Sequence, residues 1–357
     1  MSVRSPHRAW IEVDHGVLLE NLAAVRRMAG AEKQVIAVVK ANAYGHGDVA
    51  AARTLLEGGV ERLAVATVPE ALRLRAADIT APILVLWGVG EPEAAPALAA
   101  DLELTAYDTR SLRLLEAAAD DSGRRASVHL KIDTGLGRQG SDPASAVELA
   151  LGIAQSRSLR LVGTFSHLAA PGEDEAFSEV QLVRLARVLD GMRSSGLDPG
   201  LVHVSATGGI LAGIGEFADA VRPGLALYGL LPAWAADRET GLRPILSLEA
   251  LPLRLFDLPA RAAIGYGDGW PRSHANNGWT LVRGQRAPVV GAVSMDGLTV
   301  DIGDIDGVTY DDVFVLIGEQ GAARITADEV AAERRTINYE VTTALRERLP
   351  RIHLGAG

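Results

Sequence analysis

The 357-residue sequence predicts an α/β fold, in which a (β/α)8 TIM-like barrel is followed by a smaller, mainly β C-terminal domain. The first observation is that eight short apolar runs alternate with alanine-rich amphipathic segments through two-thirds of the chain, a pattern typical of a parallel barrel. The second is a change after about Pro232, where strand-like runs follow one another with short turns. The third is length, because roughly 150 residues per domain favours a barrel with a smaller partner.

The eight barrel strands are expected where apolar and β-branched residues gather in short runs. They are predicted at residues 34–40, 62–66, 83–87, 103–106, 126–132, 159–166, 201–205 and 219–222. The helices between them are predicted at residues 48–56, 70–77, 92–100, 110–119, 144–155 and 175–195. An open doubly wound sheet is the competing architecture, but no G-x-G-x-x-G motif follows the first strand.

The C-terminal domain is expected to be a sheet with short helices at its end. Its strands are predicted at residues 245–256, 279–282, 288–295, 298–302 and 313–317, and its helices at 327–333 and 339–349. A lone strand at about 8–13 precedes a helix at 17–27 and is a candidate to join this domain. We therefore place the barrel at residues 12–238 and the mainly β domain at residues 239–357.

Composition excludes several classes of function. The net charge of −10 offers no basic surplus to neutralise nucleic-acid phosphates. The absence of cysteine excludes disulfides, a thiolate nucleophile and thiolate metal ligands, and we expect no metal site. No signal-peptide core begins the chain, and no run approaches the ~20 apolar residues of a membrane span. A cytoplasmic protein is expected.

The stretch V-V-K-A-N-A-Y-G-H-G (residues 38–47) places Lys40 at the carboxyl end of the first predicted barrel strand, where α/β enzymes build their sites. A lysine that leaves an apolar wall is partly desolvated, which lowers its pKa and frees the amine to act as nucleophile or base. Tyr44 offers a phenol nearby, and Gly45 and Gly47 let the backbone approach a ligand. The alternative is a lysine that merely ends a strand and extends to solvent.

This decapeptide closely resembles the signature around the cofactor lysine of the alanine racemase family, whose members use pyridoxal 5′-phosphate (PLP). The resemblance implies that Lys40 carries PLP covalently and that Tyr44 belongs to the cofactor site. L-K-I-D-T-G-L-G-R-Q-G (residues 130–140) is similar to the second family signature. This similarity implies that Arg138 contacts the PLP phenolic oxygen and the substrate carboxylate. It also implies that Lys131 is the lysine that many members carry as a carbamate. A glycine turn without function is the alternative for this segment.

Two further matches lie at the ends of predicted barrel strands, T-F-S-H-L (residues 164–168) and A-V-R-P-G-L-A-L-Y-G (residues 220–229). By resemblance, His167 packs near the PLP ring and hydrogen-bonds Arg222, which faces the pyridine nitrogen; a lone histidine at a strand end is more often structural. A guanidinium with a pKa above about 12 donates to an unprotonated ring nitrogen, which suits racemisation better than transamination or decarboxylation. The Pro-Gly turn exposes the amides of Gly224 and Leu225, which can hold a phosphate.

Three matches lie in or near the predicted C-terminal domain. A-I-G-Y-G-D-G-W (residues 263–270) presents Tyr266, which the resemblance implies is a second base that reaches the site of the other subunit. V-S-M-D resembles the segment in which the methionine amide, here that of Met295, meets the substrate carboxylate. I-N-Y-E-V supplies Tyr339, which matches the phosphate-binding tyrosine of the family.

The chain also departs from the family pattern. Ala206 and Thr207 stand where the family usually has Asn-Ser, although the Thr207 hydroxyl can still donate to a phosphate. Ala292 and Gly172 replace an arginine and an aspartate that commonly pair across the substrate entryway. This double loss predicts a more open corridor and broader substrate tolerance.

The resemblance implies a PLP-dependent racemase that interconverts L- and D-alanine, with Lys40 and Tyr266 as bases on opposite faces of the substrate. It further implies a homodimer with shared active sites, acting in D-alanine biosynthesis for the cell wall. The alternatives are a racemase of broader specificity, for example for serine, a PLP-dependent decarboxylase of the same fold type III, and a non-catalytic PLP carrier.

Overall fold

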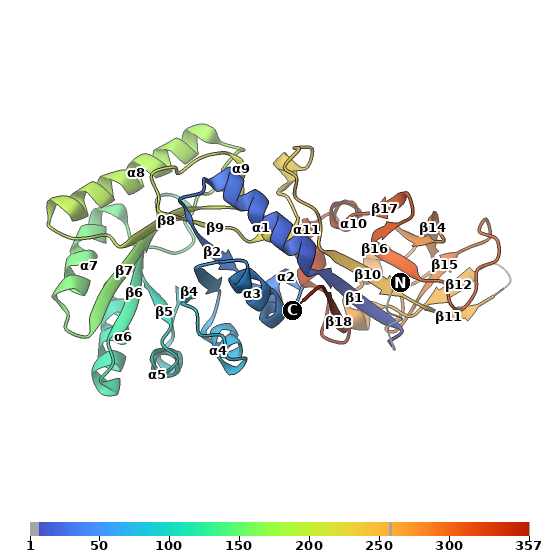
Figure 1. Cartoon of the computed structure of the whole chain (residues 1–357), viewed down its shortest axis with the longest axis horizontal. Coiled ribbons are helices and arrows are strands. Elements are labelled where there is room, and N and C mark those ends of the chain that lie inside the picture. Colours follow the sequence, from blue (N-terminus) through green and yellow to red (C-terminus); the bar gives the residue numbers. More distant parts are fainter. Residues whose placement is uncertain (1–6, 257–258, 357) are drawn as a thin grey trace.

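The computed structural model describes residues 7–256 and 259–356 and confirms a closed, parallel eight-stranded barrel (Figure 1). The barrel strands are β2 (Gln34–Val38), β3 (Arg62–Val65), β4 (Ile83–Gly88), β5 (Glu103–Ala106), β6 (Ala126–Lys131), β7 (Leu159–Phe165), β8 (Leu201–Ala206) and β9 (Ala220–Arg222). The helices that alternate with them are α3 (Asp48–Glu57), α4 (Val68–Ala76), α5 (Glu91–Ala99), α6 (Thr109–Ser122), α7 (Pro143–Gln155) and α8 (Glu175–Ser194). β9 closes the barrel by pairing with β2, where Ala220 lies opposite Gln34.

The barrel strands are covered on both faces, as parallel strands usually are. All six residues of β6 are buried, because successive side chains point alternately into the barrel and toward the helices. The surrounding helices begin at residues that satisfy their first amides: Asp108 accepts from Ser111 N at 2.7 Å at the start of α6, and Asp142 accepts from Ala144 N at 2.8 Å at the start of α7.

The second part is a mainly β region built on one mixed sheet. Among the described residues the sheet has ten strands: β1 (Ala9–Asp14), β10 (Leu246–Ala250), β11 (Pro252–Leu255), β12 (Pro259–Ala262), β13 (Trp279–Val282), β14 (Gln285–Val290), β15 (Leu298–Asp301), β16 (Phe314–Gln320), β17 (Ala323–Ile325) and β18 (Arg351–Leu354). Two helices, α10 (Ala327–Arg334) and α11 (Asn338–Thr343), pack near its end. In β10 buried and half-buried residues alternate, the pattern of a strand with one face on a core.

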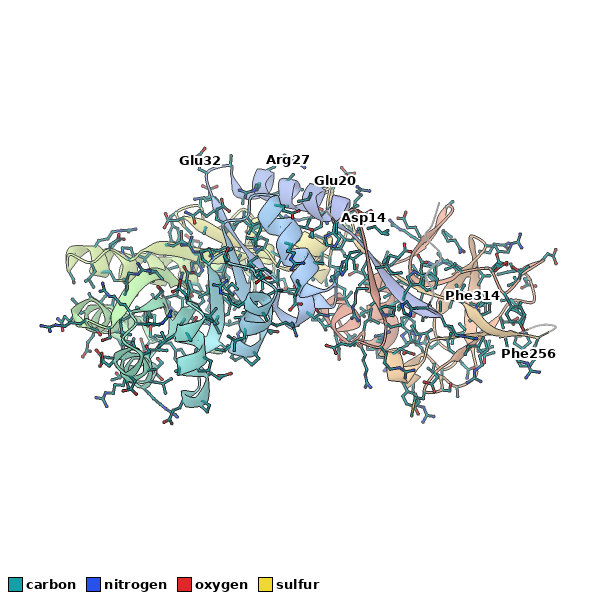
Figure 2. The ribbon with its side chains drawn as sticks, turned by 60° about the horizontal axis from the view of Figure 1, so that its bottom comes forward. Asp14, Glu20, Arg27, Glu32, Phe256 and Phe314 are labelled. Atoms are coloured by element: carbon teal, nitrogen blue, oxygen red, sulfur yellow. The ribbon has the colours of Figure 1, made fainter. Side chains whose placement is uncertain are left out.

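The first strand belongs to the C-terminal sheet. β1 pairs antiparallel with β10 and parallel with β18, and Figure 1 shows β1 within that part of the molecule. The helix α1 (His15–Ala29) then leads to the barrel, with Glu20 and Arg27 on its exposed side (Figure 2). Within the described residues, no helix combines the length and apolarity needed to cross a bilayer.

The structure differs from the predicted elements at several places. The strand predicted at 34–40 ends at Val38, the one at 245–256 divides into β10 and β11, and the one at 288–295 ends at Val290, before Gly291 at φ +71°. The helix predicted at 339–349 is only α11. The strands β12, β17 and β18 were not predicted, because runs such as P-A-R-A and A-R-I are too short and polar to show an alternating pattern.

Candidate active site

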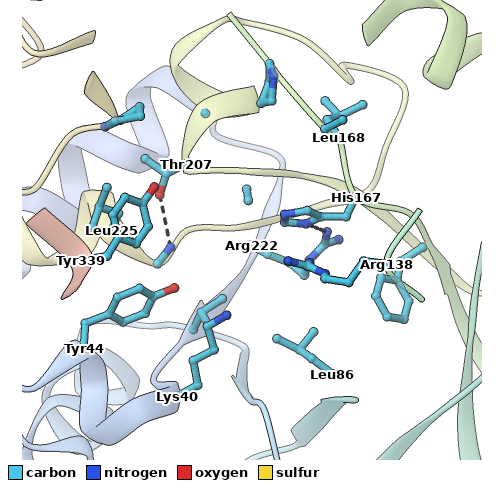
Figure 3. A pocket seen from close by; sticks show the side chains of 18 of the residues that line it. Lys40, Tyr44, Leu86, Arg138, His167, Leu168, Thr207, Arg222, Leu225 and Tyr339 are labelled. Atoms are coloured by element: carbon cyan, nitrogen blue, oxygen red, sulfur yellow. Dashed lines mark hydrogen bonds between the residues drawn. The ribbon is translucent and has the colours of Figure 1, made fainter. Parts of the chain in front are cut away.

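A cavity of about 440 Å³ lies where the barrel strands end at their carboxyl termini (Figure 3). Ten residues of the predicted site line it: Lys40, Tyr44, Lys131, Arg138, His167, Thr207, Arg222, Gly224, Leu225 and Tyr339. Figure 3 shows the hydroxyls of Tyr44, Tyr339 and Thr207 on one side and the groups of Arg138, His167 and Arg222 on the other, with the Lys40 amine between them. The cavity therefore has a hydroxyl-rich end and a cationic end.

Lys40 stands at the start of a strained turn. It begins α2 (Lys40–Tyr44), in which Ala41, Asn42, Ala43 and Tyr44 all have φ between 51° and 55°. The left-handed conformation costs about 1–2 kcal/mol per residue with a side chain, and such strain gathers at functional sites. Hydrogen bonds hold the turn: Ala41 N donates to Glu70 Oε1 at 2.7 Å, and Gly45 N donates to Ala41 O at 3.0 Å.

The environment of the Lys40 amine lowers its pKa and so shifts it toward the neutral form. Burial lowers the pKa of Lys40, and the nearby charge of Arg138 lowers it further. The chain has only three lysines, and two of them, Lys40 and Lys131, line this cavity. A neutral amine beside a cavity can act as nucleophile or base.

The cationic end holds three more basic side chains, Lys131, Arg138 and Arg222. Burial, together with the charges of Arg138 and Arg222, lowers the pKa of Lys131 to about 8. Its amine donates to Gln139 Oε1 at 3.2 Å. Burial and Arg138 lower the pKa of Arg222 to about 9. Cations this close in a buried cavity repel one another, so the cavity favours an anionic ligand.

Arg222 is fixed by acceptors around it. Its Nη2 donates to Ser166 O at 2.7 Å and to Val204 O at 3.1 Å, and lies 3.3 Å from His167 Nδ1. Its Nη1 lies 2.6 Å from His203 Nδ1. Burial and the charge of Arg222 hold the pKa of His167 well below its usual value, so His167 is a neutral acceptor.

The hydroxyl-rich end is closely packed around Gly224. Thr207 Oγ1 accepts from Gly224 N at 3.3 Å and from Ala226 N at 3.1 Å. A Cβ at Gly224 would lie 2.9 Å from Tyr44 Cζ, so only glycine fits beside the phenol. Burial raises the pKa of Tyr44, and it also raises that of Tyr339. Both phenols therefore keep their protons at neutral pH and can donate to an anion.

Tyr266 and Met295 do not line this cavity. They lie in two loops of the C-terminal part that are joined by hydrogen bonds, from Tyr266 N to Ser294 O at 3.0 Å and from Gly267 N to Met295 O at 2.9 Å. A Cβ at Gly265 would lie 2.5 Å from Met295 O, so the loops pack backbone to backbone. Both side chains are exposed, at 37% for Tyr266 and 50% for Met295.

Several lining residues were not predicted. Phe165 lies beneath the guanidinium of Arg222, with Cζ 5.2 Å from the ring centre, and Trp87 and Trp234 form parts of the wall. Behind Arg222 lie two buried histidines, His129 and His203. His129 could have been predicted from the sequence, because side chains two residues apart in a strand lie on the same face. His129 lies two residues before Lys131 in β6. No sequence signal marks Trp234.

Comparison with known proteins gives one consistent result. The family model for the alanine racemase N-terminal domain matches residues 13–232, and that for the alanine racemase C-terminal domain matches residues 259–353. "Alanine racemase 2" of Caldanaerobacter subterraneus subsp. tengcongensis is 36% identical, over 97% of this chain and 95% of that protein. The alanine racemase of Methanococcus maripaludis is 35% identical, over 98% of this chain and 99% of that protein.

Solved structures agree. The alanine racemase of Clostridium difficile 630 superposes with a TM-score of 0.94 at 28% identity, covering 99% of this chain and 98% of that one. The enzyme of the D-cycloserine producer Streptomyces lavendulae superposes with a TM-score of 0.90 at 32% identity, covering 99% and 98%. The chain belongs to the alanine racemase family.

Proposed function

We propose that this protein interconverts L-alanine and D-alanine with PLP as its cofactor. The observation that carries the proposal is the lysine amine of lowered pKa at the end of β2, between a hydroxyl-rich end and a cationic end of one cavity. Members of the alanine racemase family named for this activity match almost the whole chain.

The residues of the cavity fit PLP. The cofactor carries a phosphate, a phenolic oxygen and an aldehyde that can condense with a lysine. The hydroxyls of Tyr44, Tyr339 and Thr207 and the turn at Gly224 and Leu225 suit the phosphate. Arg138 offers positive charge for the phenolic oxygen and a substrate carboxylate, and Arg222 offers a donor for the ring nitrogen. Bound PLP supplies an electron-withdrawing ring that acidifies the α-hydrogen of the amino acid.

The protein's own groups then bind the substrate and move a proton. Arg138 binds the substrate carboxylate through its planar fork. Arg222 would donate a hydrogen bond to the pyridine nitrogen without giving up its proton, so the nitrogen would stay unprotonated and the ring would be a weaker electron sink. The pKa of about 8 leaves part of Lys131 neutral near physiological pH, which carbamylation by carbon dioxide requires, and a carbamate there would orient Arg138. Lys40 is the base on one face of the substrate.

The second base is proposed to come from another copy of the chain. Tyr266 is exposed on a loop with Met295, and neither residue lines the cavity of its own chain. We therefore propose a homodimer in which these two side chains complete the partner's site. A C-terminal domain that begins near residue 239 would supply them. The cytoplasmic location and a role in cell-wall precursor supply stay predictions.

The alternatives are less well supported. A PLP-dependent decarboxylase would need a group that strengthens the ring as an electron sink, and Arg222 does not do so. A non-catalytic PLP carrier would not need the C-terminal domain that carries Tyr266. A racemase of broader specificity stays the strongest alternative, because Gly172 and Ala292 depart from the family pattern at the entryway.

The proposal is tested by D-alanine formation from L-alanine with PLP, measured by a coupled assay. Lys40→Ala should abolish both turnover and the visible absorbance of covalently bound cofactor. Lys33→Ala is the matched control and should leave both unchanged, because Lys33 donates to Ala218 O and does not line the cavity. Full activity of the Lys40→Ala protein would refute the assignment.

A further inference from the structure

A chain of hydrogen bonds crosses the barrel interior beneath Arg222. Arg222 Nη1 lies 2.6 Å from His203 Nδ1, His203 Nε2 lies 3.0 Å from His129 Nδ1, and His129 Nε2 lies 3.1 Å from Glu103 Oε2. Arg62 closes the chain, with its Nε 3.3 Å from Glu103 Oε1. Glu103 and Arg62 are the first residues of β5 and β3, so the chain runs from the amino end of the barrel to the active site.

Resting on the function proposed above, we propose that Glu103 is a positioning residue for the reaction: through His129 and His203 it fixes the direction of the hydrogen bonds that hold Arg222 toward the cofactor. The direction follows from the chemistry of the two ends. A guanidinium can only donate, and a carboxylate can only accept.

The tautomers of both histidines follow from these ends. Arg222 can only donate, so the neutral ring of His203 accepts on Nδ1 and carries its proton on Nε2. That proton faces His129 Nδ1, which must accept it, so the proton of His129 lies on Nε2 and faces Glu103. Each nitrogen in the chain thus has a donor or acceptor role that matches its neighbour. A carboxylate bonded to one imidazole nitrogen makes the other a better acceptor, as in histidines whose second nitrogen faces a metal.

Charges in the barrel agree with these roles. Burial and Arg222 hold the pKa of His203 well below its usual value, so His203 is neutral. Burial opposes ionisation of Glu103, but the bonds from His129 and Arg62 outweigh it and lower the pKa of Glu103. Glu103 is therefore an anion at one end of the hydrogen-bond chain, and Arg222 is the buried cation at the other.

The packing of the barrel makes room for the chain of hydrogen bonds. Gly163 lies on β7, between the strands that carry the two histidines, and a Cβ there would lie 2.5 Å from His129 Cε1. The φ of Gly163 is not positive, so glycine is required for space rather than for conformation. The ring of Phe165 stacks on His203 with centroids 4.7 Å apart and fixes the plane of the imidazole. The space at Gly163 and the stacking of Phe165 thus accommodate and orient the two buried histidines.

One side of the Arg222 guanidinium stays available to a ligand. Its Nη1 and Nη2 bond protein acceptors, whereas no described residue accepts from its Nε. The hydrogen bond to His203 holds Nη1, and together with the acceptors around Nη2 it orients the guanidinium in the cavity. A change at Glu103 acts on Arg222 without touching any group that lines the cavity.

The first test is neutron diffraction of the wild-type holoenzyme, which locates the hydrogen atoms and needs no variant. Both His129 and His203 should carry hydrogen on Nε2 and none on Nδ1. Hydrogen on Nδ1 of either ring would overturn the proposal. This result does not depend on which amino acid is the substrate, so its failure can be told apart from failure of the proposed function.

The second test compares Glu103→Gln with Thr105→Val. Thr105 lies two residues further along β5, is fully buried and donates to Val85 O at 2.6 Å. Loss of its hydroxyl therefore removes a comparable buried hydrogen bond that is not part of the chain from Arg222 to Glu103. With PLP labelled by ¹⁵N at the ring nitrogen, Glu103→Gln should shift the nitrogen resonance, and kcat should fall roughly tenfold with KM nearly unchanged. Thr105→Val should leave the resonance in place. An unchanged resonance in Glu103→Gln would overturn the proposal.

Discussion

The indole of Trp234 packs against the backbone of Gly172, where a Cβ would lie 2.5 Å from Trp234 Cη2. Gly172 has φ +86°, a conformation that favours glycine. Arg238 holds the indole, with its Cζ 4.8 Å from the ring centre. The glycine that departs from the family pattern thus makes room for an aromatic wall of the cavity. The more open corridor expected from the sequence stays a prediction, and Trp234 is the cavity-lining side chain that lies against Gly172.

Replacing Trp234 by alanine should broaden the substrate range. Loss of the indole enlarges the cavity beside Pro171 and Gly172, so the kcat/KM ratio of serine or larger amino acids to alanine should rise roughly tenfold. A coupled assay with enantiopure amino acids measures it. Trp279→Ala is the control, because Trp279 is exposed on β13 and does not line the cavity. An unchanged ratio would remove Trp234 from the specificity determinants.

Replacing Tyr266 by phenylalanine should remove one of the two bases and leave the other. Racemisation should fall by about 10²-fold or more. The base that remains should still exchange the α-hydrogen of one enantiomer with deuterated solvent, which NMR measures, while the other enantiomer keeps its hydrogen. Equal exchange of both enantiomers would contradict the assignment of Tyr266.

Co-expression of Lys40→Ala and Tyr266→Phe chains should test the shared site. If Tyr266 serves the partner, a mixed dimer contains one site with both bases intact, and random pairing should restore roughly one quarter of wild-type activity. If Tyr266 serves its own chain, no mixed dimer has a complete site. Activity no higher than that of the two separate variants would therefore exclude the proposed dimer arrangement.

Replacing Gly163 by alanine should destabilise the barrel. The added methyl group meets His129 between two barrel strands, and such overpacking costs about 1–3 kcal/mol of unfolding free energy. Gly152→Ala is the matched control, because Gly152 lies in α7 and its Cβ would meet Leu112 Cδ1 at an ordinary 3.9 Å. That change should stabilise the protein by about 0.5–1 kcal/mol. Chemical denaturation compares the two, and equal effects would show that residue 163 has room for a side chain.

Lys131 should make the cofactor-free protein more stable as the pH rises. Its pKa is lowered from 10.5 to about 8 in the fold, so between these values the unfolded chain binds more protons and stability increases with pH. The free energy of unfolding should increase by about 1–3 kcal/mol between pH 8 and 10.5, and this increase should be absent in Lys131→Met. Urea unfolding at both pH values measures it. The same pH dependence in the variant would contradict the lowered pKa.

Much of the fold could be predicted from the sequence, because barrel strands and helices carry strong periodic patterns. β5 in the barrel and β13 in the C-terminal sheet have the bounds that the sequence predicts, and the other seven barrel strands differ by one or two residues. The turn after Val38 could not be predicted, since no propensity favours four successive left-handed residues without glycine. In the C-terminal part, strands such as β17 depend on their neighbours in the sheet rather than on their own sequence.

The candidate site was predicted from motifs, and its supporting residues were not. Lys40, Arg138 and Arg222 stand in recognisable segments at strand ends. His129, His203 and Glu103 lie within strands, where a polar residue shows no sign of its partners on other strands. Trp234 lies next to Gly172 only through the folding of distant segments.

Incubation of the purified holoenzyme with L-alanine in deuterated water tests the central claim most directly. Two bases on opposite faces predict that D-alanine forms with deuterium at its α-carbon, while unreacted L-alanine at early times keeps its hydrogen. Absence of D-alanine, or D-alanine that retains the original hydrogen, would contradict the account.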